Sequence, residues 1–400
     1  MSVPHQSKVN NRAPRQINRS VVLDLVRQSE PLSRTEIARR TGLTKPTVSA
    51  IVEELMRDNA VREIGTEASG GRPARMIEYN EERVAYLGLE LGVRQTVVGV
   101  ADARGRLRAE VAEPAIVGDP KAALRLLESL VPRALSAAEV PRSRIAGICA
   151  AVPGLVDQTT GECVLAPNLG WRHLPLRSEL GALFGEPVSL YNVTQAAAAA
   201  EGRAGVAVGC DSYIWIYAGH GVGAGIVIGG RPFFGKEGYS GEIGHCRVED
   251  KGPLCGCGRR GCLETFASIS ALERAFVAAS RRAGRKAPQR KSLSAVVTAA
   301  KDGDRVARGV LAEAGARLAR GVGFLINILS PQLVVIGGEL MVAEDWVLGP
   351  MRRALPEHAV HADGVPIALS SLGERAALQG TLLLAMDNAS RSYRLAAFPR

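Results

Sequence analysis

The sequence predicts an α/β protein with a small N-terminal head and a larger body of two lobes. From residue 81 onward, short apolar runs typical of strands alternate with longer stretches of helical periodicity, which is the pattern of an α/β fold. Two apolar runs joined by a glycine-containing turn occur at residues 85–101 and again at 213–229. This repetition indicates two similar lobes with a cleft between them. The length of 400 residues also exceeds one ordinary domain.

The charge of the chain is concentrated at its N-terminal end. Residues 1–50 contain nine Lys/Arg and three Asp/Glu, so they carry +6 of the formal net charge of +10. A basic end on a near-neutral body favours a nucleic-acid-binding head, although a solvated surface has the same composition. The chain has no apolar run of transmembrane length and no signal-peptide segment, so no membrane association is expected. Seven cysteines, three of them clustered, predict a cytoplasmic protein without a disulfide framework.

The head is expected to span residues 15–80, before a body at 81–400. Residues 1–14 are polar and basic, and we expect them to form a flexible tail. Apolar residues at helical spacing then predict a helix that begins at Arg15. This helix ends at Pro31, because a proline disfavours helical geometry in the residue before it.

Two further helices follow in the head. Ser33 precedes Glu36 by three residues, a Ser-x-x-Glu pattern that predicts a capping box at the start of a helix, and Gly42 marks the end of that short helix. Thr44 is expected to cap the next helix, which carries a proline in its first turn. The apolar face of this last helix is formed by Val48, Ile51, Val52 and Leu55.

A short helix, a glycine-containing turn and a second helix form the helix-turn-helix plan. In this motif the N-terminal residues of the second helix contact the DNA major groove. The corresponding side chains are small, polar or cationic, and they suit phosphate and base-edge contacts. The residues that we expect at the DNA from the two helices are Ser33, Arg34, Thr35, Thr44, Lys45, Pro46, Thr47 and Ser49.

Two alternating runs after the helices predict a wing. They cover residues 61–64 and 76–79, and between them lies a Gly-Gly-Arg-Pro segment that would present Arg72 to a minor groove. The predicted head is therefore a winged helix-turn-helix domain. A three-helix protein-interaction bundle with a hairpin is the alternative.

The body contains further apolar runs that predict buried strands. Helical periodicity separates several of them. The strands are expected at 145–152, 213–217, 225–228 and 333–336, and the helices at 122–135, 196–205 and 306–329.

A metal site is predicted in residues 241–264. The segment contains GEIGHC and, nine residues further on, CGCGRRGCLE. A histidine and three cysteines are a donor set typical of structural zinc, and the glycines allow tight turns between the thiolates. The four ligands are His245, Cys255, Cys257 and Cys262. Cys246 points away from His245 in an extended segment, and buried free thiols are the alternative.

The two motifs of residues 241–264, the head and the two lobes together resemble the ROK family, which contains repressors and sugar kinases. The resemblance covers nearly the whole chain from about residue 15. A winged head is similar to the repressor branch, whose regulators respond to N-acetylglucosamine, glucose or xylose. The resemblance implies an actin-like (ribonuclease H-like) fold for the body, and it implies zinc on the same four residues.

The resemblance also allows the residues that ROK kinases need for catalysis to be compared with those of this chain. ROK kinases carry Asp-x-Gly-x-Thr in the first phosphate turn, where this chain has Glu90 and Arg94 at the Asp and Thr positions. They carry an Asn-Asp pair whose Asp is the base for the sugar hydroxyl, where this chain has Asn192 and Val193. Valine accepts no proton, so phosphoryl transfer is expected to be absent. An active sugar kinase with an accessory head is the alternative.

The sugar-contacting positions of the family are retained in this chain. The resemblance implies that they are Gly154, Asn168, Asn192, Glu242, His245 and Glu264. Amides and carboxylates suit the vicinal hydroxyls of a sugar. A pocket that no longer binds sugar is the alternative.

The expected function is a transcriptional regulator, a repressor of sugar-metabolism genes. Its partners would be a double-stranded operator and a sugar or sugar derivative that controls DNA binding. A homodimer or homotetramer would fit a pseudo-palindromic operator. A phosphotransferase-system protein is an alternative effector.

Overall fold

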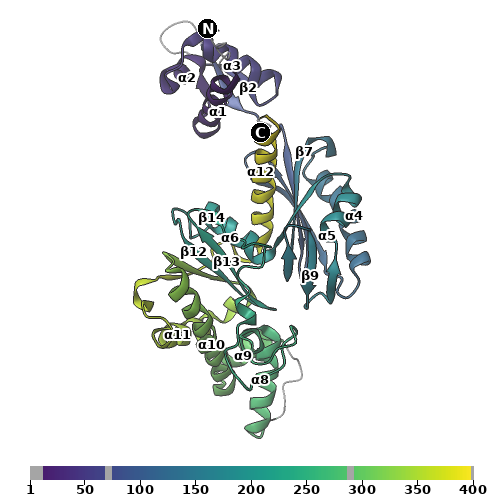
Figure 1. Ribbon diagram of the computed structural model, residues 1–400, viewed down its shortest axis with the longest axis vertical. Helices are drawn as coiled ribbons and strands as arrows, with labels where there is room; N and C mark the ends of the chain where they lie inside the picture. Colours follow the sequence, from purple (N-terminus) through teal and green to yellow (C-terminus); the bar gives the residue numbers. More distant parts are fainter. Residues whose placement is uncertain (1–11, 68–73, 286–291, 398–400) are drawn as a thin grey trace, which may run out of the picture. The chain divides into compact units, whose positions relative to one another are not determined.

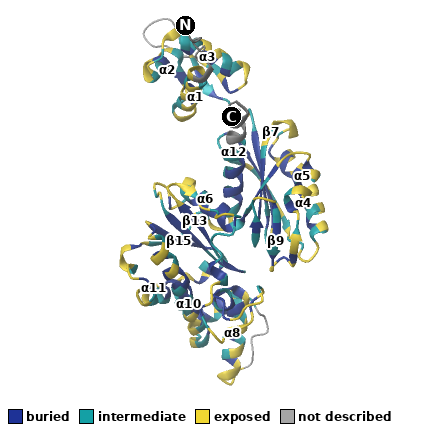
Figure 2. Ribbon diagram, viewed as in Figure 1, coloured by how far each residue is buried: buried dark blue, intermediate teal, exposed yellow. Residues whose placement is uncertain are grey.

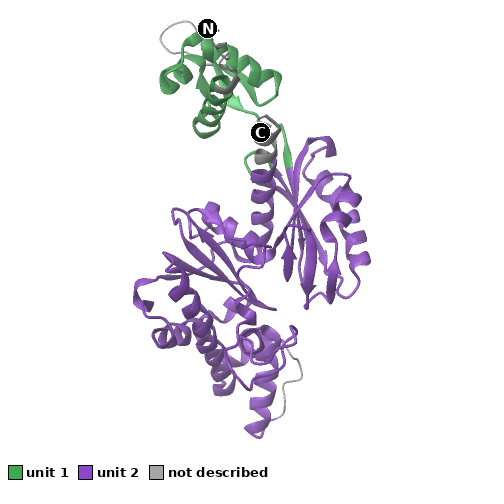
Figure 3. Cartoon of the chain, in the orientation of Figure 1, with its two compact units in different colours: residues 1–85, 102–106 green, residues 86–101, 107–400 purple. Residues whose placement is uncertain are grey.

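The computed structural model describes residues 12–67, 74–285 and 292–397 (Figure 1). The chain divides into two compact units (Figure 3). Unit 1 comprises residues 1–85 together with 102–106, and unit 2 comprises residues 86–101 and 107–400. The boundaries at residues 15, 80 and 81 stay predictions. Among the described residues, no helix is both long and apolar enough to cross a membrane.

Unit 1 has three helices and a three-stranded sheet in its described part. In chain order the elements are α1 (Arg12–Ser29), β1 (Leu32–Ser33), α2 (Arg34–Thr41), α3 (Lys45–Arg57), β2 (Val61–Glu67) and β3 (Ala74–Tyr79). Helix α1 begins at Arg12, inside the stretch for which a tail is predicted. Pro14 falls in its first turn, where backbone N–H groups have no intrahelical acceptor, so the proline is tolerated. Residues 1–11 of the predicted tail lie outside the described part.

The N-cap residues of α2 and α3 are those that the sequence predicts, but the reciprocal half of the capping box at α2 is not formed. The Ser33 hydroxyl accepts from Glu36 N (3.2 Å), and the Glu36 carboxylate pairs with Arg39 instead of returning to the cap. The Thr44 hydroxyl accepts from the backbone N of Thr47, and the φ angle of 71° at Gly42 ends α2. The apolar face of α3 is buried in the core of unit 1, as expected.

Strands β2 and β3 form the predicted antiparallel wing. Val61 pairs with Tyr79 at one end, and Glu67 pairs with Ala74 at the other. Strand β1 adds to β3, which gives the sheet order β1-β3-β2. The predicted wing tip, with Arg72, lies outside the described residues. The described part of unit 1 is thus a winged helix-turn-helix.

The first lobe of unit 2 is built on a five-stranded sheet of order β11-β7-β4-β5-β6. The elements of this lobe are β4 (Ala85–Leu91), β5 (Gln95–Asp102), β6 (Leu107–Pro114), α4 (Pro120–Ala137), β7 (Ile145–Val152), β8 (Leu155–Asp157), β9 (Glu162–Ala166), β10 (Trp171–Leu174), α5 (Leu176–Phe184) and β11 (Val188–Asn192). Strands β8, β9 and β10 form a small separate sheet. Figure 1 shows α4 and α5 on the opposite face of the large sheet from α12 (Ala376–Ala397).

The second lobe has a five-stranded sheet of order β14-β13-β12-β15-β16. Its strands and principal helices are α6 (Val193–Ala204), β12 (Tyr213–Ala218), β13 (Val222–Ile228), β14 (Arg231–Pro232), α7 (Glu264–Ala267), α8 (Ile269–Arg282), α9 (Leu293–Lys301), α10 (Arg305–Leu329), β15 (Leu333–Gly337), α11 (Glu344–Ala354) and β16 (Ile367–Leu369). Strands β12 and β13 are antiparallel, whereas β12, β15 and β16 run parallel. The predicted strand–helix alternation and the two hairpin openings are confirmed.

Strand β12 separates two cores of the second lobe. Ile214 and Ile216 pack with α10 and α11 on one face, while Tyr213 and Trp215 pack with α6 on the other. This alternation follows from the period of two residues along a strand. Helix α12 packs on both α6 and β7, so it joins the two lobes of unit 2. Figure 2 shows that the inner strands and the middle of α12 are mostly buried.

Candidate functional site

The four predicted metal ligands lie together. Their ligand atoms, which come from His245, Cys255, Cys257 and Cys262, are all within 4.8 Å of one another. The Nδ1–Sγ distance from His245 to Cys255 is 3.5 Å, and the Sγ–Sγ distance from Cys257 to Cys262 is 3.7 Å. Zinc bonds of ~2.0–2.3 Å in a tetrahedron require ligand separations of roughly 3.5–3.8 Å. The donor set therefore fits a metal ion, and the exposed Cys246 is not part of it.

Glycines allow residues 241–264, the candidate metal-binding segment, to fold against their neighbours. At Gly241 the φ angle is 87°, and an added Cβ would lie 1.8 Å from the carbonyl oxygen of Ala224. At Gly261 the φ angle is 73°, and a Cβ would lie 1.6 Å from the carbonyl oxygen of Glu249. Both positions need left-handed geometry and close backbone approach, which only glycine provides without strain.

Helix α10 braces the same segment through two arginines. The Arg317 guanidinium pairs with Glu249 and lies 4.9 Å from the ring of Phe266. Arg320 donates to the carbonyl of Val248. The metal-binding segment is therefore fixed to the core of the second lobe at several points.

A pocket in unit 2 brings the predicted sugar contacts together. All six predicted residues line it, namely Gly154, Asn168, Asn192, Glu242, His245 and Glu264. They come from both lobes, because Gly154 and Asn168 follow strands β7 and β9 of the first lobe, and Glu264 begins α7 of the second. Glu90, Arg94 and Val193 line the same pocket.

His245 connects the candidate metal ligands to this pocket. Its Nδ1 atom faces Cys255, and its Nε2 atom lies 3.8 Å from Oε2 of Glu242. The Glu264 carboxylate accepts from the backbone N of Val222 (3.2 Å). Burial, together with the charge of Glu264, raises the pKa of Glu242 to about 7. Burial also raises the pKa of Glu264, while His245 lowers it in part.

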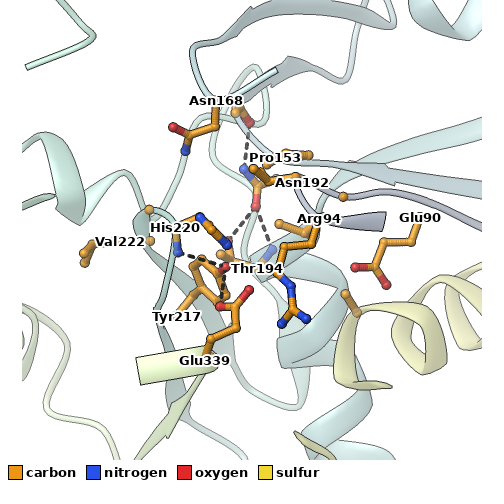
Figure 4. Close-up of a pocket in the computed structure, with 18 of the residues that line it drawn as sticks. Glu90, Arg94, Pro153, Asn168, Asn192, Thr194, Tyr217, His220, Val222 and Glu339 are labelled. Atoms are coloured by element: carbon orange, nitrogen blue, oxygen red, sulfur yellow. Dashed lines mark hydrogen bonds between the residues drawn. The ribbon is translucent and has the colours of Figure 1, made fainter. Parts of the chain in front are cut away.

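At the start of α6, the side chain of Asn192 makes internal hydrogen bonds through both its oxygen and its nitrogen (Figure 4). Oδ1 of Asn192 accepts from both the N–H and the hydroxyl of Thr194, each at 2.7 Å. Nδ2 of Asn192 donates to the carbonyl of Gly154 (2.7 Å). Asn192 is thus the N-cap of α6, a role that sequence reasoning missed although an Asn before a helical run is a common signal. Val193 adds an apolar side chain to the pocket at this helix start.

The other end of the pocket is rich in carboxylates. The Arg94 guanidinium lies 3.2 Å from the carboxylate of Glu374. The Tyr217 hydroxyl donates to Glu339 (2.7 Å), and Figure 4 shows these two side chains pointing toward one another. Burial, with Glu339 as the largest electrostatic cause, raises the pKa of Glu90 to about 8.

Sequence reasoning missed Tyr217, Glu339 and Glu374 as pocket residues. Tyr217 is part of an apolar strand run, and Glu339 follows the pair Gly337-Gly338, and a glycine pair alone is a weak signal for a ligand-facing turn. Glu374 precedes the last helix and carries no motif. Only the fold brings these three side chains to one cavity.

The predicted DNA contacts differ in their exposure. Thr35, Thr44, Lys45 and Pro46 are exposed, whereas Ser33, Thr47 and Ser49 are half-buried. Arg34 is held inside unit 1, because its guanidinium donates to Glu63 (2.6 Å) and contacts the sulfur of Met56. The N-terminal turn of α3 therefore presents a short polar and cationic surface.

Comparisons with known proteins agree with this geometry. The sequence profile of the ROK family matches residues 86–388, and that of the MarR family matches residues 16–72. The xylose repressor of Caldicellulosiruptor bescii is 30% identical over 393 residues, which cover 95% of this chain and 98% of the repressor.

Two solved structures are also similar. The first is a ROK family transcriptional regulator described as a homolog of the E. coli MLC protein, with a TM-score of 0.78, 27% identity and coverage of 96% of this chain and 100% of that one. The second is a ROK family glucokinase from Streptomyces griseus in complex with glucose and AMPPNP, with a TM-score of 0.67, 28% identity and coverage of 76% and 99%. The profile match over unit 2, together with the full-length similarity, shows that this chain belongs to the ROK family.

Proposed function

We propose that this chain is a DNA-binding transcriptional regulator, a repressor of sugar-metabolism genes that a sugar in the pocket controls. One observation carries the proposal. A winged helix-turn-helix with the exposed residues Thr44, Lys45 and Pro46 shares its chain with a ROK pocket that has Val193 at the position of the kinase base. The chain thus combines a DNA-binding domain with a pocket for a small molecule. The name of the xylose repressor, similar over nearly its full length, supports this function.

The proposal includes the loss of kinase chemistry. Val193 offers no atom that takes a proton from a sugar hydroxyl, and a positioned base commonly contributes about 10²–10⁴-fold in rate. Arg94 pairs with Glu374 in the pocket, where ROK kinases carry the threonine of the first phosphate turn.

The proposed role of the metal is structural. A Zn²⁺ ion on four protein ligands has no open position for a reactive water, and when bound it would hold the thiolates and His245 in place. His245 would then be oriented through Nδ1 while Nε2 faces the pocket. Glu242 and Glu264 flank the metal ligands in sequence, so the metal would position pocket residues without taking part in a reaction.

The regulator is proposed to act as a cytoplasmic homodimer or homotetramer. A symmetric oligomer would present two helix-turn-helix units to a pseudo-palindromic operator. Sugar binding controls the operator only if the sugar has different affinities for the DNA-binding and DNA-free states. The alternative effector is a phosphotransferase-system protein. A pulldown with the purified full chain distinguishes control by such a protein from control by a sugar.

The experiment that tests the proposal is genome-wide mapping of binding sites with the full chain, followed by mobility shifts on the recovered promoters. Retention of a promoter near sugar-metabolism genes at moderate salt, and its release by a sugar, are the expected results. Failure to retain any promoter fragment would remove the basis of the proposal. Turnover of ATP stimulated by a hexose would favour the kinase instead.

A further inference from the structure

Two arginines of unit 1 share one carboxylate. Arg34, the first residue of α2, donates from Nη1 to Oε1 of Glu63 on strand β2 (2.6 Å). Arg75 on strand β3 donates to the other oxygen of the same side chain, Oε2 (2.9 Å). Among the described residues, Glu63 is the only acidic partner of either arginine. Two positive charges therefore face one negative charge, and the cluster keeps a positive surplus.

The register of the wing explains why these side chains meet. Glu63 pairs with Ile77 across the wing, and Ile77 is buried in the core of unit 1. Arg75 precedes Ile77 by two residues, and side chains two positions apart on a strand lie on the same face. Glu63 and Arg75 are thus diagonal neighbours on the face of the sheet that packs on the helices, where Arg34 reaches them from α2.

The opposite face of the wing has balanced charges. Arg62 lies directly across from Glu78, and the two side chains form an ion pair. One arginine meets one carboxylate there, whereas two arginines meet one carboxylate at Glu63. Of these two described clusters, only the one with Glu63 has surplus positive charge for an anion such as a backbone phosphate.

Arg75 is accessible to an outside ligand. Its side chain is 70% exposed, against 29% for Arg34 and 20% for Glu63. A guanidinium has five N–H donors, and Arg75 uses one nitrogen for Glu63, so donors remain. The hydrogen bond from Arg34, together with that from Arg75, holds the pKa of Glu63 below its ordinary value although partial burial opposes this. The competing carboxylate therefore stays charged at neutral pH.

Glu63 and a DNA phosphate require the same donors. Guanidinium groups bind carboxylates and phosphates through similar charge-assisted hydrogen bonds. A phosphate that approaches Arg75 is also repelled by the charge of Glu63. Each additional phosphate neutralised by a cation steepens the slope of log affinity against log salt by about 0.9, which corresponds to about five- to tenfold in affinity at about 0.1 M salt.

We propose that Arg34 and Arg75 form a phosphate-binding surface of the head, and that Glu63 limits the affinity of this surface by occupying part of their donors. Binding to DNA of any sequence is carried by phosphate contacts, so an internal carboxylate lowers it and leaves a larger share of the binding to base contacts. Glu63 acts through the two arginines and does not itself touch the DNA. This inference rests on the proposed function, because it concerns the DNA surface of the same head.

Fluorescence anisotropy of the full-length protein with a random-sequence duplex of about 30 base pairs, at several salt concentrations, tests the inference. Glu63→Gln should bind this duplex about five- to tenfold more tightly at about 0.1 M salt, and its salt slope should steepen by about 0.9. Glu78→Gln is the matched control, because Glu78 is 21% exposed against 20% for Glu63 and lies on the opposite face of the same wing. It changes the net charge equally and should leave the slope unchanged.

A second variant distinguishes competition for Arg75 from a general effect of charge. Arg75→Gln alone should lower the slope by about 0.9. Combined with Glu63→Gln, it should remove most of the gain, because the arginine that Glu63 releases is then missing. Arg75 is largely exposed, so folding of this variant is expected to persist. Thermal melting checks the fold of each variant before titration.

The outcomes are distinguishable from failure of the proposed function. A gain in Glu63→Gln no larger than that in Glu78→Gln overturns this inference, and so does a slope that Arg75→Gln leaves unaltered. In both cases the proposed regulator survives if the wild-type protein retains a promoter. Salt-independent binding of the random duplex by the wild-type protein, without retention of any promoter fragment, overturns the proposed function and this inference together.

Discussion

The imidazole of His245 lies 3.8 Å, through Nε2, from the Glu242 carboxylate, while its Nδ1 atom lies 3.5 Å from the sulfur of Cys255. One ring therefore belongs both to the cluster of candidate metal ligands and to the pocket. Any change that releases Nδ1 from the cysteines also frees the nitrogen that faces the ligand. We therefore expect metal content and ligand affinity to change together.

Replacement of a metal ligand tests this relationship. Cys257→Ser should lower the zinc content of the purified protein, lower its melting temperature and weaken sugar binding, because His245 loses its orientation. Metal analysis, thermal melting and calorimetry measure the three effects. Cys246→Ser is the matched control, since Cys246 is exposed and next to His245 but is not one of the four ligands. Unchanged sugar binding in a zinc-free Cys257→Ser protein would contradict the proposed role of the metal.

The pH dependence of stability should report on Glu90. Its folded-state pKa is about 8, against an ordinary value of 4.5, because burial and neighbouring carboxylates disfavour the charge. The folded state thus binds more protons than the unfolded state between these values, so stability falls as pH rises through this window. Glu90→Gln should make unfolding at pH 8.5 less favourable by about 1–3 kcal/mol and should have little effect near pH 4.5.

Chemical denaturation at both pH values measures this difference. Glu128→Gln, on the exposed face of α4, is the control and should show no pH-dependent gain. An equal gain for Glu90→Gln at both pH values would point to packing instead of titration.

The exposed lysine at the start of α3 should contribute to DNA binding through phosphate. Lys45→Ala should weaken operator binding and reduce the slope of log affinity against log salt by about 0.9, the effect of one lost phosphate contact. Fluorescence anisotropy at several salt concentrations measures both. Lys121→Ala, an exposed lysine of unit 2, should leave the slope unchanged. An unaltered slope in Lys45→Ala would remove Lys45 from the DNA surface.

Arg104 should stabilise unit 1. Its guanidinium pairs with Glu30 and with Glu81 (3.1 Å), lies 5.4 Å from the centre of the Tyr79 ring and is largely buried. Arg104→Ala leaves two half-buried carboxylates without this partner, so unfolding of unit 1 should become easier by about 1–3 kcal/mol. Differential scanning calorimetry of the full chain measures this change in the stability of unit 1. Arg39→Ala removes only an exposed ion pair and should leave the transition nearly unchanged.

Local signals predicted much of the fold. Ser33 and Thr44 cap their helices as expected, because a cap depends on residues within one turn. The strand runs were found because β12 is apolar on both faces, one against α10 and one against α6. The cluster of His245 with three cysteines, which could hold a metal ion, was predictable because the cysteines fall within eight positions of a glycine-rich segment.

Long-range pairings could not be predicted in this way. The contact of Arg94 with Glu374 joins residues 280 positions apart, and that of Tyr217 with Glu339 joins residues 122 apart. No local pattern encodes such pairs, because they depend on how β4, β12 and β15 are ordered in their sheets. For the same reason the ion pair of Arg34 with Glu63 of strand β2 could not be predicted, and the DNA contact of Arg34 stays a prediction.

The course of strand β5 determines whether the head can be separated from the body as one continuous segment. Its first residue, Gln95, lines the pocket, and its end continues into the turn 102–106, which belongs to unit 1. Ala103 of that turn is buried in the core of unit 1 and donates its N–H to the carbonyl of Glu81. The head is therefore not contiguous in sequence. A head excised at residue 85 would lack part of its own core, and grafting a foreign head onto this pocket would require two segments to be exchanged together.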